Sequence, residues 1–160
     1  MSSFTIRSAR PDDAPALSAL AHLVSPYFTI HPDGHGAELF FETITPAAML
    51  DRLTSTQFQY WLAEDEAHGI IGAIALRDHS HLYHLFVSPD QHQRGCAKQL
   101  WQHLKSAALA AGTTGALTVN SSMYAQTVYT RFGFVTCGER QEMHGLAFIP
   151  MKYPIDSTQA

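Results

Sequence analysis

The sequence predicts one α/β domain with a mixed, mostly antiparallel sheet of about 6–7 strands and about four helices on its faces. The first observation is length, because 160 residues is typical of one domain. The second is that apolar segments with strand-like and helix-like spacing follow one another. The third is that no repeat or Pro/Ser-rich linker divides the chain. Residues 1–155 are therefore expected to form the domain, and residues 156–160 a short tail.

The first half of the chain is expected to give a strand, two helices and three strands. Thr45 and Pro46 favour a helix start, since Thr is a good cap and Pro suits the first helical position. Phe58, Tyr60 and Leu62 alternate with polar residues, as in a strand. The expected elements are a strand at 4–8, a helix capped by Asp12 or Asp13, an irregular loop at 26–36, a helix from Thr45-Pro46, and strands at 57–63, 70–76 and 79–87.

The second half is expected to complete the order β-α-α-β-β-β-α-β-α-β-β. A long amphipathic helix follows Gly95, and Gly112 stops it. The remaining expected elements are a strand at 117–119, a helix capped by Ser121 or Ser122 and ended by Gly133, and strands at 134–137 and 143–151.

Charge and composition exclude several classes of function. Residues 91–131 contain four cations and no Asp or Glu, so the rest of the chain carries a net charge of −8 against a total of −4. This segregation indicates either a basic end for a polyanionic ligand or ordinary solvated helix faces. Four cations are too few for extended nucleic acid. No apolar run is long enough to span a membrane and no secretory signal is visible, so a cytoplasmic location is expected.

The loop before the long helix has the features of an anion site. Free backbone amides and the helix dipole favour a phosphate there. Gly95 would let the backbone approach a ligand, Ala97 is small, and Arg94 and Lys98 add positive charge. The alternative is that Gly95 opens the helix for steric reasons alone.

Two motifs carry a family resemblance. Residues 87–97, VSPDQHQRGCA, resemble the acetyl-CoA pyrophosphate loop of the GCN5-related N-acetyltransferases (GNAT), written Arg/Gln-x-x-Gly-x-Gly/Ala after Val-x-Pro. Residues 119–134, VNSSMYAQTVYTRFGF, resemble the Asn…Ala-x-x-x-Tyr-x-x-x-Gly-Phe signature of the same family. The opening at 6–13 and the ending at 144–151 are similar as well. His92 departs from the pattern, which weakens a side-chain phosphate contact and spares the backbone cradle.

The resemblance implies a GNAT-like fold, acetyl-CoA as co-substrate and direct acetyl transfer to an amine. It implies that the pantetheine arm lies beside the strand at 79–87, which splays from the strand at 117–119, and that an amide near Leu85–Val87 meets the oxyanion. Asn120 is expected to contact the cofactor or, alternatively, to cap a helix. The cofactor-binding residues expected are Leu85, Phe86, Val87, His92, Gln93, Arg94, Gly95, Cys96, Ala97, Lys98, Asn120 and Tyr129.

Three side chains are candidates for catalysis. An amine of pKa near 10.4 is about 4 to 5 kcal/mol from its neutral form at pH 7, so a base is useful. The resemblance places this base at His81, fourteen residues before Gly95. Strand alternation puts His79, His81 and Tyr83 on one face, away from His84. The alternative for His81 is a surface or satisfied histidine.

Tyr129 matches the general-acid tyrosine of the family. It would hydrogen-bond to the departing thiolate, since full protonation is uphill by about 2 kcal/mol. From helical spacing alone, Tyr129 would be a core tyrosine. Cys96 has no paired base, so an acyl-cysteine is rejected.

The acceptor is expected to be a primary amine of a small molecule or peptide, and a cationic one. Tyr27, Phe28 and Glu38 are the candidate contacts, with Asp33 and Glu42 nearby. The alternative function is a non-catalytic acyl-CoA-binding module. No nucleic acid or membrane is expected as a partner, and a homodimer is expected only if an exposed final strand pairs with its copy.

No metal is expected. The pairs His79 with His81 and His31 with His35 have no third ligand at a fixed spacing. Both cysteines, Cys96 and Cys137, are expected to be free thiols.

Overall fold

A computed structural model describes residues 4–91 and 95–155. In chain order the elements are β1 (Phe4–Ser8), α1 (Ala14–Val24), α2 (Glu38–Glu42), α3 (Pro46–Leu53), β2 (Phe58–Asp65), β3 (Gly69–Arg77), β4 (His81–Val87), α4 (Cys96–Ala110), β5 (Gly115–Ser122), α5 (Gln126–Phe132), β6 (Val135–Thr136), β7 (Gln141–Met143) and β8 (Leu146–Ile155). Short 3-10 turns cover Pro11–Asp13, Ser25–Tyr27 and Pro89–Gln91.

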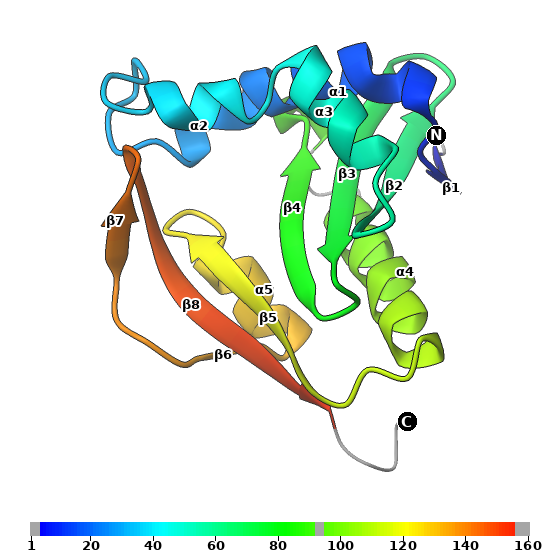
Figure 1. Cartoon of the computed structure of the whole chain (residues 1–160), viewed down its shortest axis with the longest axis vertical. Coiled ribbons are helices and arrows are strands. Elements are labelled where there is room, and N and C mark those ends of the chain that lie inside the picture. The colour runs from blue at the N-terminus through cyan, green and yellow to red at the C-terminus, as the bar shows by residue number, and fades with distance from the viewer. Residues whose placement is uncertain (1–3, 92–94, 156–160) are drawn as a thin grey trace.

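The strands form one mixed sheet, as the sequence predicts. Within the described residues it has eight strands in the order β1-β2-β3-β4-β5-β8-β6, with β7 also paired to β8. Pairing is antiparallel except between β4 and β5. Helices α1 and α3 pack on one face of the sheet, and α4 and α5 on the other (Figure 1). Each helix buries its apolar stripe there, so two cores sandwich the sheet.

The sheet opens between its two parallel strands. β4 and β5 pair only at His81↔Thr118 and Leu82↔Val119. Beyond these pairs β4 stays with β3 as far as Val87, while β5 stays with β8 as far as Ser122. The two strands therefore diverge, and Figure 1 shows them spreading apart toward α2. The splay expected beside residue 119 is confirmed.

A β-bulge in β4 overturns the expected strand alternation. His84 pairs with Ala75 and Leu82 pairs with Leu76, so Tyr83 is an extra residue in β4. A bulge turns two successive side chains to the same face. The Tyr83 and His84 rings lie 4.3 Å apart, centroid to centroid. The alternation predicted that His84 points away from Tyr83, and this prediction is wrong.

Three element boundaries also differ from expectation. His79 lies in a turn with a φ of 60°, so β4 begins at His81 and His79 does not share its face. Helix α5 begins at Gln126, four residues after Ser122, whose hydroxyl accepts a bond from the Ala125 amide at 3.1 Å. The short helix α2 was not predicted, because only five residues form it and its amphipathic pattern is too short to read.

The expected strand at 143–151 is in fact a hairpin. β7 ends at Met143, and His144 and Gly145 turn the chain with φ values of 54° and 78°. β8 then pairs with β5 on one side and with β6 and β7 on the other. The final strand is thus not an exposed edge, which removes the stated basis for a homodimer.

Candidate active site

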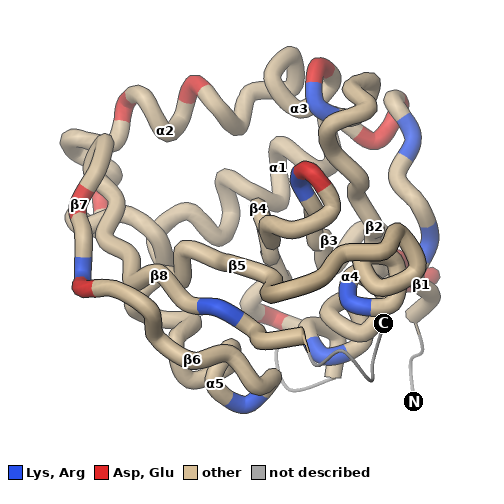
Figure 2. Tube along the Cα trace, turned by 60° about the horizontal axis from the view of Figure 1, so that its bottom comes forward, with Lys and Arg blue, Asp and Glu red and all other residues tan. Residues whose placement is uncertain are grey.

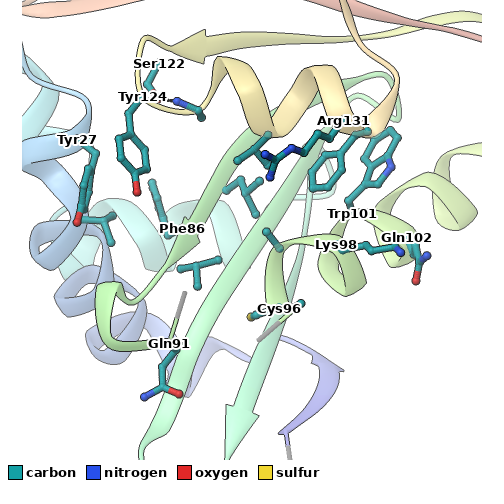
Figure 3. Close-up of a pocket in the computed structure, with 18 of the residues that line it drawn as sticks. Tyr27, Phe86, Gln91, Cys96, Lys98, Trp101, Gln102, Ser122, Tyr124 and Arg131 are labelled. Atoms are coloured by element: carbon teal, nitrogen blue, oxygen red, sulfur yellow. Dashed lines mark hydrogen bonds between the residues drawn. The ribbon is translucent and has the colours of Figure 1, made fainter. Parts of the chain in front are cut away.

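Two neighbouring cavities are lined by the described residues, and the larger of this pair lies where α4, α5 and the end of β4 meet. It has a volume of about 790 Å³. Figure 3 shows Lys98, Trp101 and Gln102 reaching it from α4 and Arg131 from α5. The Trp101 and Phe132 rings stack with centroids 5.6 Å apart, which fixes α5 against α4. The cavity is therefore built between the two helices that cover this face of the sheet.

Gly95 sits at the start of α4 in a conformation that favours glycine. Its φ is 77° and its ψ is 12°, in the left-handed region. A Cβ at Gly95 would meet no described atom within 4 Å, and Gly95 lines the larger cavity. The first amides of α4 therefore begin at the cavity wall, as an anion cradle requires. Of the loop residues predicted to contact the cofactor, His92, Gln93 and Arg94 lie outside the described residues.

The walls of this cavity carry positive charge. Lys98, Lys105 and Arg131 line it, and its described lining includes no Asp or Glu. Figure 2 shows acidic residues on α2 and a basic residue on α5, at separate parts of the molecule. Three of the four cations of the basic segment therefore line one cavity, which favours the polyanion interpretation over ordinary solvated helix faces. A cavity of this kind suits a polyanion.

Several cavity residues were missed as site residues, although the sequence holds a signal for some. Gln102 and Lys105 were not predicted, although they recur at helical spacing with the predicted Lys98 on α4, beside its apolar stripe. Trp101 lies on the apolar stripe of α4, and it both packs in the core and lines the cavity. Cys96 is only 2% exposed.

The end of β4 directs backbone amides into the gap between the splayed strands. The Ser88 amide donates to the Ile71 carbonyl of β3 at 2.8 Å. Because hydrogen-bonded and non-bonded pairs alternate in an antiparallel ladder, Phe86 also bonds to β3, and the Leu85 amide points away from it. Leu85, Phe86 and Val87 all line the larger cavity.

A smaller cavity of about 370 Å³ lies on the other side of the splay. Phe28, Leu85, Phe86, Ser122 and Ala125 line both cavities, so the two spaces meet between β4 and β5. The smaller cavity is walled by apolar side chains from α2 and from the β7–β8 hairpin. Two partners in a transfer reaction could thus approach one point from opposite sides.

Tyr129 faces the smaller cavity near this meeting point. It is 5% exposed and packs edge-on to Phe134, so the core interpretation is correct for its ring. Burial raises the pKa of Tyr129 above its ordinary value, which keeps the phenol protonated. Among the described residues, no side chain forms a hydrogen bond with the Tyr129 hydroxyl. Every fully buried side-chain nitrogen or oxygen in this part of the chain has a partner, so the hydroxyl is not fully buried. The hydroxyl therefore lies at the cavity surface.

His81 and Tyr83 line the same cavity. His81 Nδ1 is 2.7 Å from the Thr118 hydroxyl across the parallel pair. Burial, and then the charge of Arg77, lower the pKa of His81 to about 4, although Asp78 opposes this. His81 is therefore neutral at pH 7 and able to accept a proton. The Tyr83 ring lies beneath two guanidinium groups, those of Arg52 and Arg77, each 5.4 Å from the ring centroid.

His84 is a cavity residue that strand alternation placed on the wrong face. Its Nδ1 is 2.9 Å from the Tyr60 hydroxyl, which in turn accepts a bond from Arg52 Nε at 2.9 Å. Burial, and then the charge of Arg52, hold the pKa of His84 well below its ordinary value. The signal missed was the β-bulge, which a single sequence does not reveal.

The predicted acceptor contacts divide into two groups. Tyr27 and Phe28 line the larger cavity, and Phe28 reaches the smaller one. Tyr27 packs on Tyr124 with centroids 4.4 Å apart. Glu38 lines neither cavity; its carboxylate accepts a bond from the Gly36 amide at 3.3 Å.

Asn120 lines the smaller cavity and is not the residue that caps α5, whose N-cap is Ala125.

Two segments far apart in the sequence meet at one side of the smaller cavity. Thr29 bridges Leu146, and the Ile30 amide donates to the Gly145 carbonyl at 2.8 Å. The loop at 26–36 and the final hairpin therefore act as one wall.

The described residues contain no group of three or more His, Cys, Asp or Glu side chains arranged to hold a metal ion. In the same part of the chain, no helix combines the length and the apolar character needed to cross a membrane.

Comparisons with known proteins agree with this geometry. Residues 28–155 match the family model described as an acetyltransferase (GNAT) domain. Among curated proteins, none matches the sequence significantly.

Several solved structures have the same fold. A GCN5-related N-acetyltransferase from Rhodopseudomonas palustris has a TM-score of 0.77 and 22% identity, covering 97% of this chain and 98% of that one. The PaiA N-acetyltransferase of Thermoplasma acidophilum, in complex with coenzyme A, has a TM-score of 0.75 and 18% identity, covering 96% and 99%. A GNAT acetyltransferase of Staphylococcus aureus has a TM-score of 0.71 and 16% identity, covering 94% and 98%.

Proposed function

This chain belongs to the GNAT family of acetyltransferases, and on that premise we propose that it transfers the acetyl group of acetyl-CoA directly to a primary amine of a small molecule or peptide. The observation that carries the proposal is the meeting of two cavities at the splay of β4 and β5, beside Tyr129. One cavity suits the co-substrate of the family, and the other suits an acceptor.

The larger cavity fits coenzyme A by its chemistry. The amides at the start of α4 and the side chains of Lys98, Lys105 and Arg131 would hold the phosphates. The Leu85 amide, which points toward β5, would pair with the pantetheine arm as an added strand does. When bound, the co-substrate supplies an activated acetyl thioester. A related structure from Thermoplasma acidophilum holds coenzyme A, which supports this assignment.

Tyr129 is proposed to donate a hydrogen bond to the sulfur that departs. Its raised pKa makes complete proton transfer to a thiolate more costly than the roughly 2 kcal/mol expected for an ordinary phenol and thiol. A hydrogen bond from a neutral phenol still stabilises the developing negative charge. Tyr129 therefore acts as a positioned donor whose proton stays largely on oxygen.

His81 is proposed as the base that receives a proton from the amine nitrogen. Direct removal from a free ammonium group of pKa near 10.4 would be uphill by about 9 kcal/mol for an imidazole of pKa about 4. The acceptor is therefore expected to lose one proton to solvent before it reacts. The nitrogen becomes far more acidic once its lone pair is engaged in bonding, and neutral His81 can then accept its second proton. Tyr83, beside it, is proposed to orient the acceptor.

The expected preference for a cationic acceptor receives no support from the cavity lining. It was based on Asp33, Glu38 and Glu42, and none of these residues lines either cavity. The proposal is therefore limited to a primary amine. Absence of a metal, a cytoplasmic location and a homodimer stay predictions.

Thiol release from acetyl-CoA with a panel of primary amines tests the proposal. Tyr129→Phe should lower kcat by about tenfold to a hundredfold and leave the Kd for coenzyme A within about twofold, because only the hydrogen bond to sulfur is lost. Tyr153→Phe is the matched control, since Tyr153 packs in the same core and lines neither cavity. Binding of coenzyme A with no turnover on any amine would instead favour a non-catalytic module.

A further inference from the structure

The acceptor side of the site contains a buried histidine whose tautomer we assign by requiring that the hydroxyl proton of its partner, Tyr60, also has an acceptor. His84 is 9% exposed and lines the smaller cavity. Arg52 Nε can only donate, so the Tyr60 oxygen accepts from it and the Tyr60 proton is free to be donated onward. Its partner is His84 Nδ1, at 2.9 Å. The proton of the neutral imidazole is then on Nε2.

Nε2–H is available to a ligand. Among the described residues, Nε2 has no hydrogen-bond partner. Every fully buried side-chain nitrogen or oxygen in this part of the chain does have a partner, so Nε2 is not fully buried. The atom therefore faces the cavity that His84 lines. The Tyr83 and Phe86 rings flank the imidazole at 4.3 and 4.6 Å, centroid to centroid, which limits its rotation. A fixed donor in a small apolar cavity selects for an acceptor atom on the ligand.

The charge around this donor is positive. Arg52, behind Tyr60, bonds to the Thr43 carbonyl, to Met49 Sδ at 3.2 Å and to the Tyr60 hydroxyl, all neutral groups. No carboxylate of the described residues pairs with it. Arg77 lines the cavity and has Asp78 as its nearest carboxylate, at 3.8 Å. The described lining of the cavity includes Arg77 and no Asp or Glu.

We propose that the acceptor amine carries a carboxylate, which accepts a hydrogen bond from His84 Nε2 at the Arg52–Arg77 end of the smaller cavity. This inference rests on the proposed function and deepens it by naming the acceptor class. The rest of the lining is apolar and aromatic, with Leu39, Phe40 and Phe148 among it, so the acceptor also carries an apolar group. A free amino acid with a branched or aromatic side chain has these three groups.

The Arg52–Tyr60–His84 chain positions the donor and does not touch the reacting atoms. An anion near a buried donor is stabilised by a charge-assisted bond and by the guanidinium behind it. The low pKa of His84 supports an imidazole that is neutral when it donates this hydrogen bond. Tyr60 and Arg52 are therefore positioning residues, and His84 is a specificity-determining one.

Calorimetry on the full-length protein saturated with coenzyme A tests the inference without requiring turnover. The probes are leucine, leucinamide and 3-methylbutylamine, which share the branched side chain, and phenylalanine, phenylalaninamide and 2-phenylethylamine. We expect at least one amino acid to bind about tenfold or more tightly than both its amide and its decarboxylated amine. Equal or tighter binding of the amide, or no binding of either amino acid, would overturn the inference.

Variants of His84 separate recognition from packing. His84→Gln keeps an N–H near the position of Nε2 and should preserve the preference for the carboxylate to within a few fold. His84→Phe removes the donor, keeps an aromatic ring and should abolish the preference, with coenzyme A binding unchanged as a check on folding. A carboxylate preference that persists in His84→Phe would refute the role of this residue.

Turnover on the same probes keeps the two proposals distinct. If the amino acids bind preferentially and are not acetylated, the proposed acetyl transfer to them fails while the binding site stands. If all amines are acetylated with equal kcat/KM and bind with equal affinity, acetyl transfer stands and the carboxylate site is wrong.

Discussion

Burial acts on the side chains of this site in opposite directions according to their chemistry. It raises the pKa of Tyr129 and lowers those of His81 and His84, because in each case the charged form is the one penalised. All three groups are consequently neutral near pH 7. In the proposed mechanism the neutral Tyr129 and His84 donate hydrogen bonds, and the neutral His81 accepts a proton.

The pH dependence of turnover follows from the low pKa of His81. With a pKa of about 4, His81 does not change its charge between pH 5 and 8. We expect kcat/KM to rise about tenfold per pH unit below the pKa of the acceptor amine, with no break near pH 6.5. The rise reflects the neutral fraction of the amine. Initial rates with two amines of different pKa measure it, and the rising limb should move with the amine.

His81→Gln checks the assignment of that limb. The variant should lower kcat while the limb stays at the same pH, since the titrating group is the substrate. A break near pH 6.5 that disappears in His81→Gln would mean that the histidine titrates normally and that its environment is more polar than the structure indicates.

At the scale of the element, the start of α4 is the proposed place of close approach between the backbone and the co-substrate. Gly95 and Gly112 are glycines just before and just after this helix, with φ values of 77° and 87°. A Cβ at either position would meet no described atom within 4 Å. An alanine would therefore be strained to a similar degree at either position. The two positions differ in location, because only Gly95 lines the larger cavity.

Substituting each glycine by alanine separates strain from binding. Gly95→Ala and Gly112→Ala should each lower the free energy of unfolding by about 1–2 kcal/mol, the cost of a left-handed alanine. Only Gly95→Ala should weaken coenzyme A binding, by about tenfold or more, because its methyl group enters the cavity. Urea unfolding and calorimetry with coenzyme A measure the two effects.

Two results with these glycine variants would contradict the proposed contact between coenzyme A and Gly95. If both variants bound coenzyme A as the wild type does, the phosphates would not lie against the start of α4. If both weakened binding equally, the effect would come from α4 as a whole and not from contact at Gly95.

For the whole molecule, the buried His84 and the half-buried His81 connect stability to pH. Both have folded-state pKa values below the unfolded value near 6.5, so the unfolded chain binds more protons as the pH falls. Their contribution is fully present above pH 6.5 and is lost as the pH falls toward the folded values. The free energy of unfolding should therefore decrease below pH 6.5, with a slope of at most about 1.4 kcal/mol per pH unit from His84. His81 adds less, because solvent reaches part of it.

Urea unfolding at pH 7.5 and 5.5 measures this dependence. His84→Gln should flatten it, and His103→Gln, on an exposed position of α4, is the matched control for the loss of a histidine. A free energy of unfolding that is the same at both pH values in the wild type would mean that the buried imidazoles accept protons without penalty.

Much of the fold could be read from the sequence because its signals are local. The apolar stripe after Gly95, the Thr45 cap and the alternation at 58–62 each involve residues within a few positions of one another, and each element formed as expected. Two features were not predicted because they are shorter than the sequence windows in which periodicity can be recognised. They are the five-residue helix α2 and the two-residue turn at 144–145.

The sequence motifs predicted several residues that the structure places at the cavities. Gly95, Lys98 and Tyr129 lie at cavities because the motifs join a loop to a helix. His84, Arg52 and Arg77 were not found, since they come together only through a bulge in β4 and through packing of α3 on the sheet.

The sequence by itself determined the family, the class of fold and the basic character of the larger cavity, since each depends on residue types at short spacings. Only the tertiary structure decided what lies on the acceptor side. One extra residue in β4 reverses the direction of His84, and its hydrogen bond with Tyr60 assigns its proton to Nε2. Register and burial depend on partners distant in the chain, and local sequence patterns do not encode them.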